Sequence, residues 1–353
     1  MTIRIQGREI GPGAPAYVVA ELSGNHNGDI ERAVAILRAA AAAGADAIKL
    51  QTYTPDMMTL PVADDMFVVP GDGPWGGRHL HDLYAEAHTP WEWHRRLFDE
   101  AAALGVAIFS TPFDATAVDF LEELDAPAYK VSSFELADDA LLRRVSATRK
   151  PVILSTGMAS LEEIAHAVTT LRTAGVTELV LLKCTSAYPA SDASMNLEAI
   201  GLLGRIFDCP VGLSDHSLGT TAAVVAVTLG ASFIEKHVTL SRSDGGVDSH
   251  FSLEPDELKE LVHSVRRAEA MRGRPSFGPG LEEEGNLVFR RSLFVVRDIA
   301  VGEPFTSGNV RAIRPGHGLS PRHLDVVLGR RASRAVAMGT PLSWELIAGG
   351  QTE

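Results

Sequence analysis

Residues 210–240 read PVGLSDHSLGTTAAVVAVTLGASFIEKHVTL, and they contain the repeating unit of the chain. The apolar runs at 210–216 and 233–240 have the length and residue types of buried strands. Residues 219–230 form a helical pattern between them. A strand, a helix and a second strand predict a right-handed βαβ unit with parallel strands.

The same alternation extends over most of the chain. Eight runs fit strands: Tyr17–Leu22, Ala47–Tyr53, Ala107–Phe113, Ala128–Ser133, Pro151–Gly157, Glu178–Ser186, Pro210–His216 and Phe233–Leu240. A first helix is capped by Asp29 and closed by Gly44, and others are expected at about 115–124, 138–147, 160–174, 195–206, 219–230 and 255–272. Eight such repeats predict an α/β fold, a closed (β/α)8 TIM barrel. No Gly-x-Gly-x-x-Gly opens a helix after the first strand, which disfavours a dinucleotide-binding sheet.

The domain organisation follows from composition. Residues 3–10 indicate a short hairpin, so we expect a barrel domain with an N-terminal hairpin over residues 1–272. Gly, Pro and charge cluster in RGRPSFGPGLEEEGN, which predicts a linker at 273–285. The remaining residues, 286–353, consist of short stretches rich in strand-forming residues, and we expect them to form a small second domain. The segment 54–90 is long for a connection within a barrel, and such segments are usually functional.

Charge and composition exclude several classes of protein. The 353 residues include 32 Lys and Arg against 45 Asp and Glu, a net charge of −13 that would repel nucleic acid. Only two cysteines occur, Cys184 and Cys209, so a disulfide scaffold is excluded and reduced cytosolic thiols are expected. No apolar signal core opens the chain, and no run of about 18 uncharged apolar residues occurs. We therefore expect no membrane span and a cytoplasmic protein.

Polar residues stand at the ends of nearly all the predicted strands, where TIM barrels carry their active sites. They include Glu21, Lys49, Thr111, Lys130, Ser133, Glu135, Ser155, Lys183, Ser214, His216, Glu235, Lys236 and His237. Burying a lysine or glutamate is costly unless the charge is paired. A single such residue would usually be structural, but ionisable groups on so many strands predict an active site.

His216 and His237 are expected on adjacent strands at the same level. Parallel strands lie about 4.8 Å apart, so both imidazoles can reach one metal ion. Two protein ligands would leave positions open for water or substrate. Without sulfur ligands, Mn2+ or Mg2+ fits an oxygen-rich pocket better than Zn2+ does. A hydrogen-bonded histidine pair in the core explains the spacing as well.

Lys49 and Lys130, together with nearby hydroxyl groups, form a plausible anion site. Such a site could hold a phosphate and a carboxylate. The alternative is that each lysine pairs with a carboxylate of the chain, namely Glu21, Glu135 or Glu235. Both can hold in the empty protein.

Nine stretches of the sequence match a known family and occur in the same order as in that family. They are AELSGNHNGD, GADAIKLQTYTPD, FSTPFD, YKVSSFE, ILSTGMAS, LLKCTSAYP, VGLSDHSLG, GASFIEKHVTL and IRPGHGLSP. Together they resemble the sialic acid synthase family, whose members condense phosphoenolpyruvate with an amino sugar. The resemblance covers about residues 17–320, and it implies a TIM barrel followed by a small antifreeze-like (SAF) domain.

One branch of that family is more similar. QTYTPDMMTL, GPWGGRHLHDLYAEAHTPWEWH and TPFDATAVDFLEEL resemble pseudaminic acid synthases, whose acceptor is a 6-deoxy diacetamido hexose of the altro series. N-acetylneuraminate synthases usually have Asn in a Cys-Thr-Asn-x-Tyr motif, which reads CTSAY at 184–188 here. N-acetylneuraminate or legionaminic acid synthesis remains the alternative within the family.

The resemblance implies a role for each matching residue. The two metal ligands are His216 and His237, with Mn2+ expected first and Mg2+ or Co2+ as alternatives. The phosphoenolpyruvate site matches Lys49, Thr111, Lys130, Ser133, Ser155 and Ser214, with Ser186 in place of an asparagine. The positions near the acceptor or the reacting water match Glu21, Glu135, Tyr188, Glu235 and Asp248. Arg314 matches an arginine that the second domain places over the partner's barrel, which implies a domain-swapped homodimer.

The catalytic set is then Glu21, Glu235, Lys49 and Lys130, with either glutamate handling the water. Cys184 is expected to be buried beside the site and is given no nucleophilic role, because no histidine positioned beside it is evident from the sequence. Two readings outside the family remain open. One is a non-catalytic carbohydrate-binding barrel, which predicts loss of the ionisable strand ends. The other is an aldolase that forms a Schiff base on Lys130 or Lys183 and needs no metal.

Overall fold

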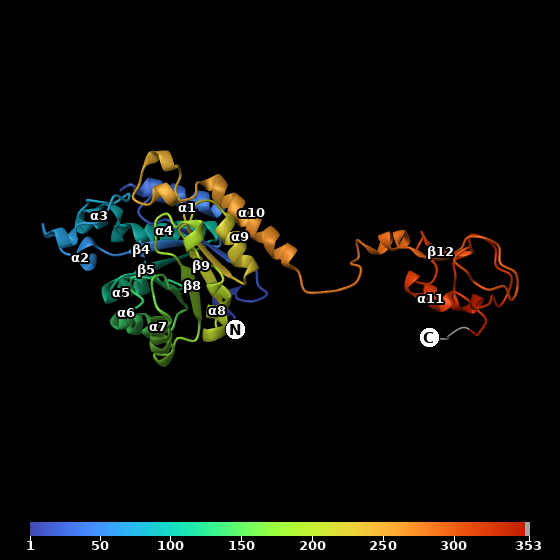
Figure 1. Ribbon diagram of the computed structural model, residues 1–353. Coiled ribbons are helices and arrows are strands. Elements are labelled where there is room, and N and C mark those ends of the chain that lie inside the picture. Colours follow the sequence, from blue (N-terminus) through green and yellow to red (C-terminus); the bar gives the residue numbers. More distant parts are fainter. Residues whose placement is uncertain (350–353) are drawn as a thin grey trace. The chain divides into compact units, whose positions relative to one another are not determined.

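A computed structural model describes residues 1–349 of the chain. The chain divides into two compact units, Met1–Gly273 and Arg274–Glu353, and each is described by itself. Figure 1 shows the barrel strands of the first unit surrounded by helices. Within the described residues, no helix is long and apolar enough to cross a membrane. The cytoplasmic location stays a prediction.

The eight expected strands form a closed parallel barrel, so the predicted fold is confirmed. In sheet order the strands are β3 (Tyr17–Glu21), β4 (Ala47–Thr52), β5 (Ala107–Pro112), β6 (Tyr129–Val131), β7 (Val152–Ser155), β8 (Leu179–Cys184), β9 (Val211–Asp215) and β10 (Phe233–His237). Strand β10 pairs with β9 on one side and with β3 on the other, which closes the barrel. The carboxyl ends of all eight strands therefore meet at one rim.

Helices connect these strands and pack against their outer faces. They are α1 (Ile30–Ala42), α4 (Trp91–Leu104), α5 (Ala115–Glu123), α6 (Asp139–Ala147), α7 (Leu161–Thr173), α8 (Ala199–Phe207), α9 (Thr221–Thr228) and α10 (Pro255–Arg272), with short 3-10 turns at Asp192–Ser194, Arg242–Asp244 and Ser249–Phe251. Asp29 caps α1 as expected, because its side chain accepts a hydrogen bond from the backbone N–H of Glu31. Helix α8 begins later than the pattern indicated, since Asn196 adopts a positive φ.

The opposite end of the barrel is filled by the N-terminal hairpin. Strands β1 (Ile3–Ile5) and β2 (Arg8–Ile10) pair antiparallel, as the sequence indicated. Their three isoleucines are buried in one apolar cluster with Tyr17 and Phe233 from the barrel interior. Apolar burial stabilises this end by about 25 cal/mol per Å2. This end of the barrel interior is therefore closed by apolar packing.

The segment that follows β4 is more ordered than a loop. It contains α2 (Pro55–Met58), a 3-10 turn at Asp65–Phe67 and α3 (Leu80–Ala87), before α4 begins at Trp91. His94 joins the two ends of this insertion: its Nε2 lies 2.8 Å from Thr52 Oγ1, and its Nδ1 lies 3.2 Å from the carbonyl oxygen of Pro90. Residues 53–90 are called the β4 insertion below.

The second unit is small and has an apolar core of its own. A 3-10 turn at Glu284–Phe289 precedes the antiparallel strands β11 (Ser292–Val295) and β12 (Val310–Ile313), and α11 (Leu324–Val327) follows, with further 3-10 turns at Pro321–His323 and Trp344–Leu346. Leu293, Phe305 and Val327 are among its fully buried residues. Isolated antiparallel bridges, such as Ile299 with Val336, complete this domain.

Candidate active site

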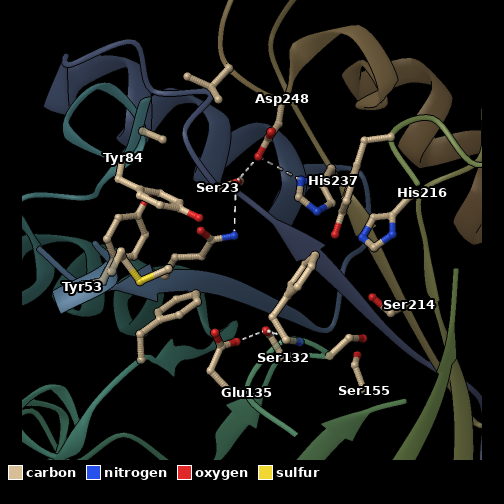
Figure 2. A pocket seen from close by; sticks show the side chains of 18 of the residues that line it. Ser23, Tyr53, Tyr84, Ser132, Glu135, Ser155, Ser214, His216, His237 and Asp248 are labelled. Atoms are coloured by element: carbon tan, nitrogen blue, oxygen red, sulfur yellow. Dashed lines mark hydrogen bonds and ion pairs between the residues drawn. The ribbon is translucent and has the colours of Figure 1, made fainter. Parts of the chain in front are cut away.

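A cavity of about 520 Å3 opens at the rim where the barrel strands end. Most of the predicted site residues line it: Lys49, Lys130, Ser133, Glu135, Ser155, Tyr188, Ser214, His216, Glu235, His237 and Asp248. Glu21 and Thr111 lie behind them and contact Lys49. Figure 2 shows the two histidines, Ser155 and Ser214 on one side of this cavity and Tyr53 and Tyr84 on the other. The site thus has two chemically different halves.

Two lysines and two glutamates form a buried charged cluster at the base of the cavity. Lys49 Nζ lies 2.7 Å from Glu21 Oε2 and 3.4 Å from Glu235 Oε1, and Lys130 Nζ lies 3.1 Å from the same Glu235 oxygen. Ser214 Oγ donates to that oxygen as well, at 3.2 Å. The lysines do pair with carboxylates of the chain, as the alternative reading held, but Glu135 is not one of them.

The two glutamates differ in charge preference. Burial would raise the pKa of Glu235, but Lys130 and Lys49 outweigh it and hold that pKa below its usual range. Burial raises the pKa of Glu21, and Lys49 only partly offsets the effect. Glu235 is therefore the ionised partner and Glu21 the one that takes up a proton first. The other oxygen of Glu235, Oε2, is buried and has no hydrogen-bond partner among the described residues.

His216 and His237 lie side by side, with ring centroids 5.3 Å apart. His216 Nδ1 lies 3.1 Å from the carbonyl oxygen of Thr185, and donation to it would leave Nε2 as an acceptor. His237 Nδ1 is buried without a hydrogen-bond partner in the described chain and lies 3.7 Å from Asp248 Oδ2. Burial, followed by the charge of His216, holds the pKa of His237 well below its usual range.

These features suit a divalent metal ion. Neutral imidazoles are the form that binds metals, and a carbonyl that fixes the tautomer is a common outer partner. Within residues 1–349, no group of three or more His, Cys, Asp and Glu side chains is arranged to hold a metal. Any metal here would therefore rest on two histidines and keep positions for water or substrate.

A group of small hydroxyl residues lies beside the charged cluster. Ser155 Oγ is buried with no partner among the described residues, and Ser133 Oγ accepts a hydrogen bond from the backbone N–H of Gly157 at 2.9 Å. A Cβ at Gly157 would come within 2.8 Å of Ser133 Oγ and within 2.4 Å of Ser186 Oγ. Only glycine leaves room for these hydroxyls. Hydroxyls beside buried lysines can bind an anion such as phosphate.

Cys184 is buried in the cavity lining, as expected, and the structure adds a neighbouring histidine that was not evident from the sequence. Its Sγ lies 3.8 Å from His216 Nδ1 and 3.7 Å from Ser186 Oγ, so a histidine does stand beside the thiol. Sequence spacing could not show this, because the contact joins β8 to the residue after β9. Ser186 itself lies outside the cavity lining and is half-buried.

The other half of the cavity is formed by aromatic and apolar side chains. Members of the β4 insertion supply Tyr53, Met58, Val69, Trp75, Leu80, Leu83, Tyr84 and Ala87. Trp75 fixes the insertion over the rim, because its Nε1 donates to the carbonyl oxygen of Val247 at 2.8 Å and its ring lies 5.4 Å from that of Tyr188. Glu135 accepts a hydrogen bond from Ser132 on the far side, and burial raises the pKa of Glu135.

Several lining residues were not among the predicted site residues. They are Ser23, Gln51, Tyr53, Tyr84, Ser132 and Cys184. Gln51 could have been found, because it follows Lys49 by two residues and shares its face of β4. Ser23 depends on loop conformation, and Tyr84 depends on how α3 packs over the rim, so neither carries such a signal. Arg314 lies in the second unit just after β12 and is exposed, and its predicted role stays a prediction.

Comparison with known proteins agrees with this site. A model of the NeuB family matches residues 36–276, and one of the SAF domain matches residues 290–348. The chain belongs to the NeuB family. It is therefore an enzyme of the transferase class, and the sequence resemblance to sialic acid synthases is confirmed. The alternative of a non-catalytic carbohydrate-binding barrel is thereby excluded.

Individual relatives of this NeuB family member align over nearly their whole length. A pseudaminic acid synthase of Campylobacter jejuni is 43% identical over 92% of this chain and 95% of its own. A pseudaminic acid synthase of Helicobacter pylori is 42% identical over 93% of this chain and 97% of its own. The crystal structure of an N-acetylneuraminic acid synthetase from Leptospira borgpetersenii, in complex with citrate, superposes with a TM-score of 0.73 at 30% identity and covers 81% of this chain and 95% of that one.

Proposed function

We propose that this enzyme condenses phosphoenolpyruvate with 2,4-diacetamido-2,4,6-trideoxy-L-altrose to give pseudaminic acid and phosphate. The observation that carries the proposal is the division of one cavity into a charged, hydroxyl-rich half and an apolar half formed by the β4 insertion. The names of the Campylobacter and Helicobacter relatives support it. Carbon 3 of phosphoenolpyruvate would bond to the aldehyde carbon of the open sugar, water would add at carbon 2, and phosphate would leave with C–O cleavage.

The charged half fits phosphoenolpyruvate. Lys49 and Lys130 offer two buried positive charges, and Ser133, Ser155 and Ser214 offer hydroxyls for the phosphate and carboxylate oxygens. Holding both reactants in one cavity supplies much of the rate by orientation alone. Thr111 accepts a hydrogen bond from Lys49 at 3.1 Å and so orients its ammonium group.

Glu235 is the better candidate to handle the attacking water. Its carboxylate is ionised, it lines the cavity, and its Oε2 is not occupied by any described residue. Glu21 lies behind Lys49 and does not line the cavity. We therefore assign Glu235 the role of orienting and deprotonating the water, and Glu21 the role of holding Lys49.

A divalent metal held by His216 and His237, with Mn2+ expected first, would act as a Lewis acid on the aldehyde oxygen of the acceptor. The residues that fit this metal are the two imidazoles described above, with Asp248 beside His237. Tyr188 closes the same edge, because its ring lies 4.4 Å from that of His216.

The apolar half favours a deoxy sugar with acetyl groups. Three methyl groups on the acceptor, one at carbon 6 and two in the acetamido groups, would lie against side chains such as Val69, Leu83 and Tyr84. A 6-hydroxyl group would lose water there without gaining a partner on these apolar side chains.

The first experiment measures phosphate release from phosphoenolpyruvate with Mn2+ and offers the diacetamido altrose, its legionaminic-type counterpart and N-acetylmannosamine in parallel. We expect release with the altro sugar and abolition of that release by EDTA, with recovery when Mn2+ is restored. Release with N-acetylmannosamine instead would contradict the assigned acceptor and leave the chemistry intact. Release that survives EDTA, together with borohydride trapping of a lysine adduct, would point to a Schiff-base aldolase.

We also propose that the enzyme is a homodimer in which Arg314 of one subunit completes the site of the other. Charge supports this exchange. Residues 274–353 contain ten arginines, no lysine and eight Asp and Glu, a net charge of +2, which leaves −15 for residues 1–273. Opposite charges favour docking of the small domain on a barrel.

Mixed dimers test this arrangement. Differently tagged Arg314→Ala and Glu235→Gln chains are co-expressed and the hybrid is purified by both tags. If Arg314 acts across the dimer, one of the two sites in the hybrid is intact, so about half of the wild-type activity is expected while each parent dimer is nearly inactive. An inactive hybrid would show that Arg314 serves its own barrel, and a monomeric wild type would exclude the exchange.

A further inference from the structure

Ser23 has a backbone conformation that glycine would adopt at lower cost. Its φ is +47°, in the left-handed region, and the residue is only 2% exposed at the cavity lining. A side chain is retained in this region mainly where it serves a purpose, because the Cβ is strained there. The hydroxyl of Ser23 is therefore the feature that needs an explanation.

Three polar groups meet at this residue. The Ser23 backbone N–H donates to Glu21 Oε1 at 3.1 Å, and its Oγ is hydrogen-bonded to Asp248 Oδ2. Gln51 Nε2 donates to the same Oγ at 3.2 Å. Since an amide NH2 can only donate, and an ionised carboxylate can only accept, the hydroxyl passes its own proton towards Asp248. Figure 2 shows this connection between Ser23, Asp248 and His237.

The direction of these bonds determines what the cavity offers to a ligand. With its NH2 turned to Ser23, Gln51 has its amide oxygen left as an acceptor, and Asp248 has Oδ1 left as another. Gln51, Ser23 and Asp248 all line the cavity, and Figure 2 shows Ser23 and Asp248 between the tyrosines of the β4 insertion and the histidine pair. The free oxygens of Gln51 and Asp248 lie in the same cavity as the apolar side chains of the β4 insertion. This combination suits a ligand that carries N–H or O–H donors next to methyl groups.

We propose that Ser23 is a positioning residue for the acceptor: it holds Gln51 and Asp248 so that their oxygens accept hydrogen bonds from an acetamido N–H and a neighbouring hydroxyl of the sugar. This inference rests on the proposed function, because it names how that substrate is bound. Ser155 and Ser214 lie across the cavity from Ser23 in Figure 2. The link from Ser23 to Lys49 runs through the Ser23 backbone N–H and Glu21, and not through the Ser23 hydroxyl. Its effect should therefore be confined to the sugar.

Two substitutions separate the hydroxyl from the backbone. Ser23→Ala removes the hydroxyl and keeps the strained φ, whereas Ser23→Gly removes the hydroxyl and relieves the strain. We expect both to raise the KM for the acceptor about tenfold or more, the loss typical of a hydrogen bond to a charged group, with the KM for phosphoenolpyruvate changed less than twofold. Thermal stability should differ between the two, with Ser23→Gly at least as stable as wild type.

A matched control relieves the same strain elsewhere. Asp208 has a φ of +45° at the end of α8 and is exposed, so Asp208→Gly should leave both KM values unchanged. If the acceptor KM follows stability, rising in Ser23→Ala and not in Ser23→Gly, the role of Ser23 is structural and the proposal is wrong. Equal rises in both KM values would also overturn it.

A binding measurement separates this proposal from the proposed function. The alditol made by reducing the aldehyde of the diacetamido altrose cannot condense, so its affinity is measured by calorimetry with phosphoenolpyruvate and Mn2+ present. If wild type releases no phosphate but binds the alditol about tenfold more tightly than both Ser23 variants, the positioning role stands and the proposed reaction fails. If wild type is active and the variants bind the alditol equally well, the positioning role fails alone. If wild type neither reacts nor binds, both are overturned.

Discussion

Replacing Glu235 by glutamine is expected to lower the rate of phosphate release about a thousandfold, within the range for loss of a general base. Glu235 is the shared counter-charge of Lys49 and Lys130, and its buried Oε2 has no hydrogen-bond partner among the described residues. Glutamine keeps the shape and the hydrogen bond from Ser214 but cannot take a proton. The loss should appear in kcat, because both lysines still face the phosphoenolpyruvate anion. Its KM should stay the same or fall.

Glu122→Gln provides the control for this measurement. Glu122 lies at the surface, where it pairs with Lys150 at 2.9 Å and accepts a hydrogen bond from Tyr129, so it is a paired carboxylate of the same unit outside the cavity. Its loss should leave kcat within twofold of wild type. A Glu235→Gln enzyme that retains a tenth of wild-type kcat would show that another group handles the water, and Glu21→Gln would be examined next.

The barrel and its charged cluster could be predicted because both depend on short-range pattern. Alternation along a strand places Glu235 and His237 on one face and Lys236 on the other. The structure shows this division, since Lys236 is buried in an ion pair with Asp215 at 2.8 Å and does not line the cavity. Adjacent strands in register then bring Glu21 beside Lys49 and Glu235 beside Ser214.

The acceptor half could not be predicted, because it is built from contacts between distant loops. Trp75 bonds to Val247 across 172 positions of the chain. Ser23 has a φ in the left-handed region, and the residue type serine does not predict that conformation. The β4 insertion was recognised by its length, but its helices and the direction of its side chains depend on packing against the barrel. Helix α4 was also missed in the sequence, although four of its residues are buried on one face.

The β4 insertion is expected to make the fold sensitive to acid. Burial lowers the pKa of His94 and of His26 to about 4 each, against an ordinary value of 6.5. His94 joins the ends of the insertion, and His26 packs edge-on against Trp93 at 5.2 Å. Below pH 6.5 these two histidines bind protons in the unfolded chain, whereas in the folded chain they stay neutral until the pH approaches 4. The free energy of unfolding therefore falls as the pH is lowered through this window.

Each histidine should contribute about 3 kcal/mol to this loss, from a shift of roughly 2.5 pKa units at 1.36 kcal/mol per unit. Urea unfolding between pH 7.5 and 4.5 in EDTA measures it, and His94→Gln should flatten the slope by one histidine's share. Burial also lowers the pKa of His237, so His237 adds to the loss of stability in acid. Its contribution is the same in every variant and cancels when the slopes are compared. His166→Gln is the matched control, because His166 is an exposed histidine on α7 that pairs with Asp139 and not with the insertion. If His94→Gln keeps the wild-type slope, the acid sensitivity lies elsewhere and the insertion is held to the barrel by its apolar contacts alone.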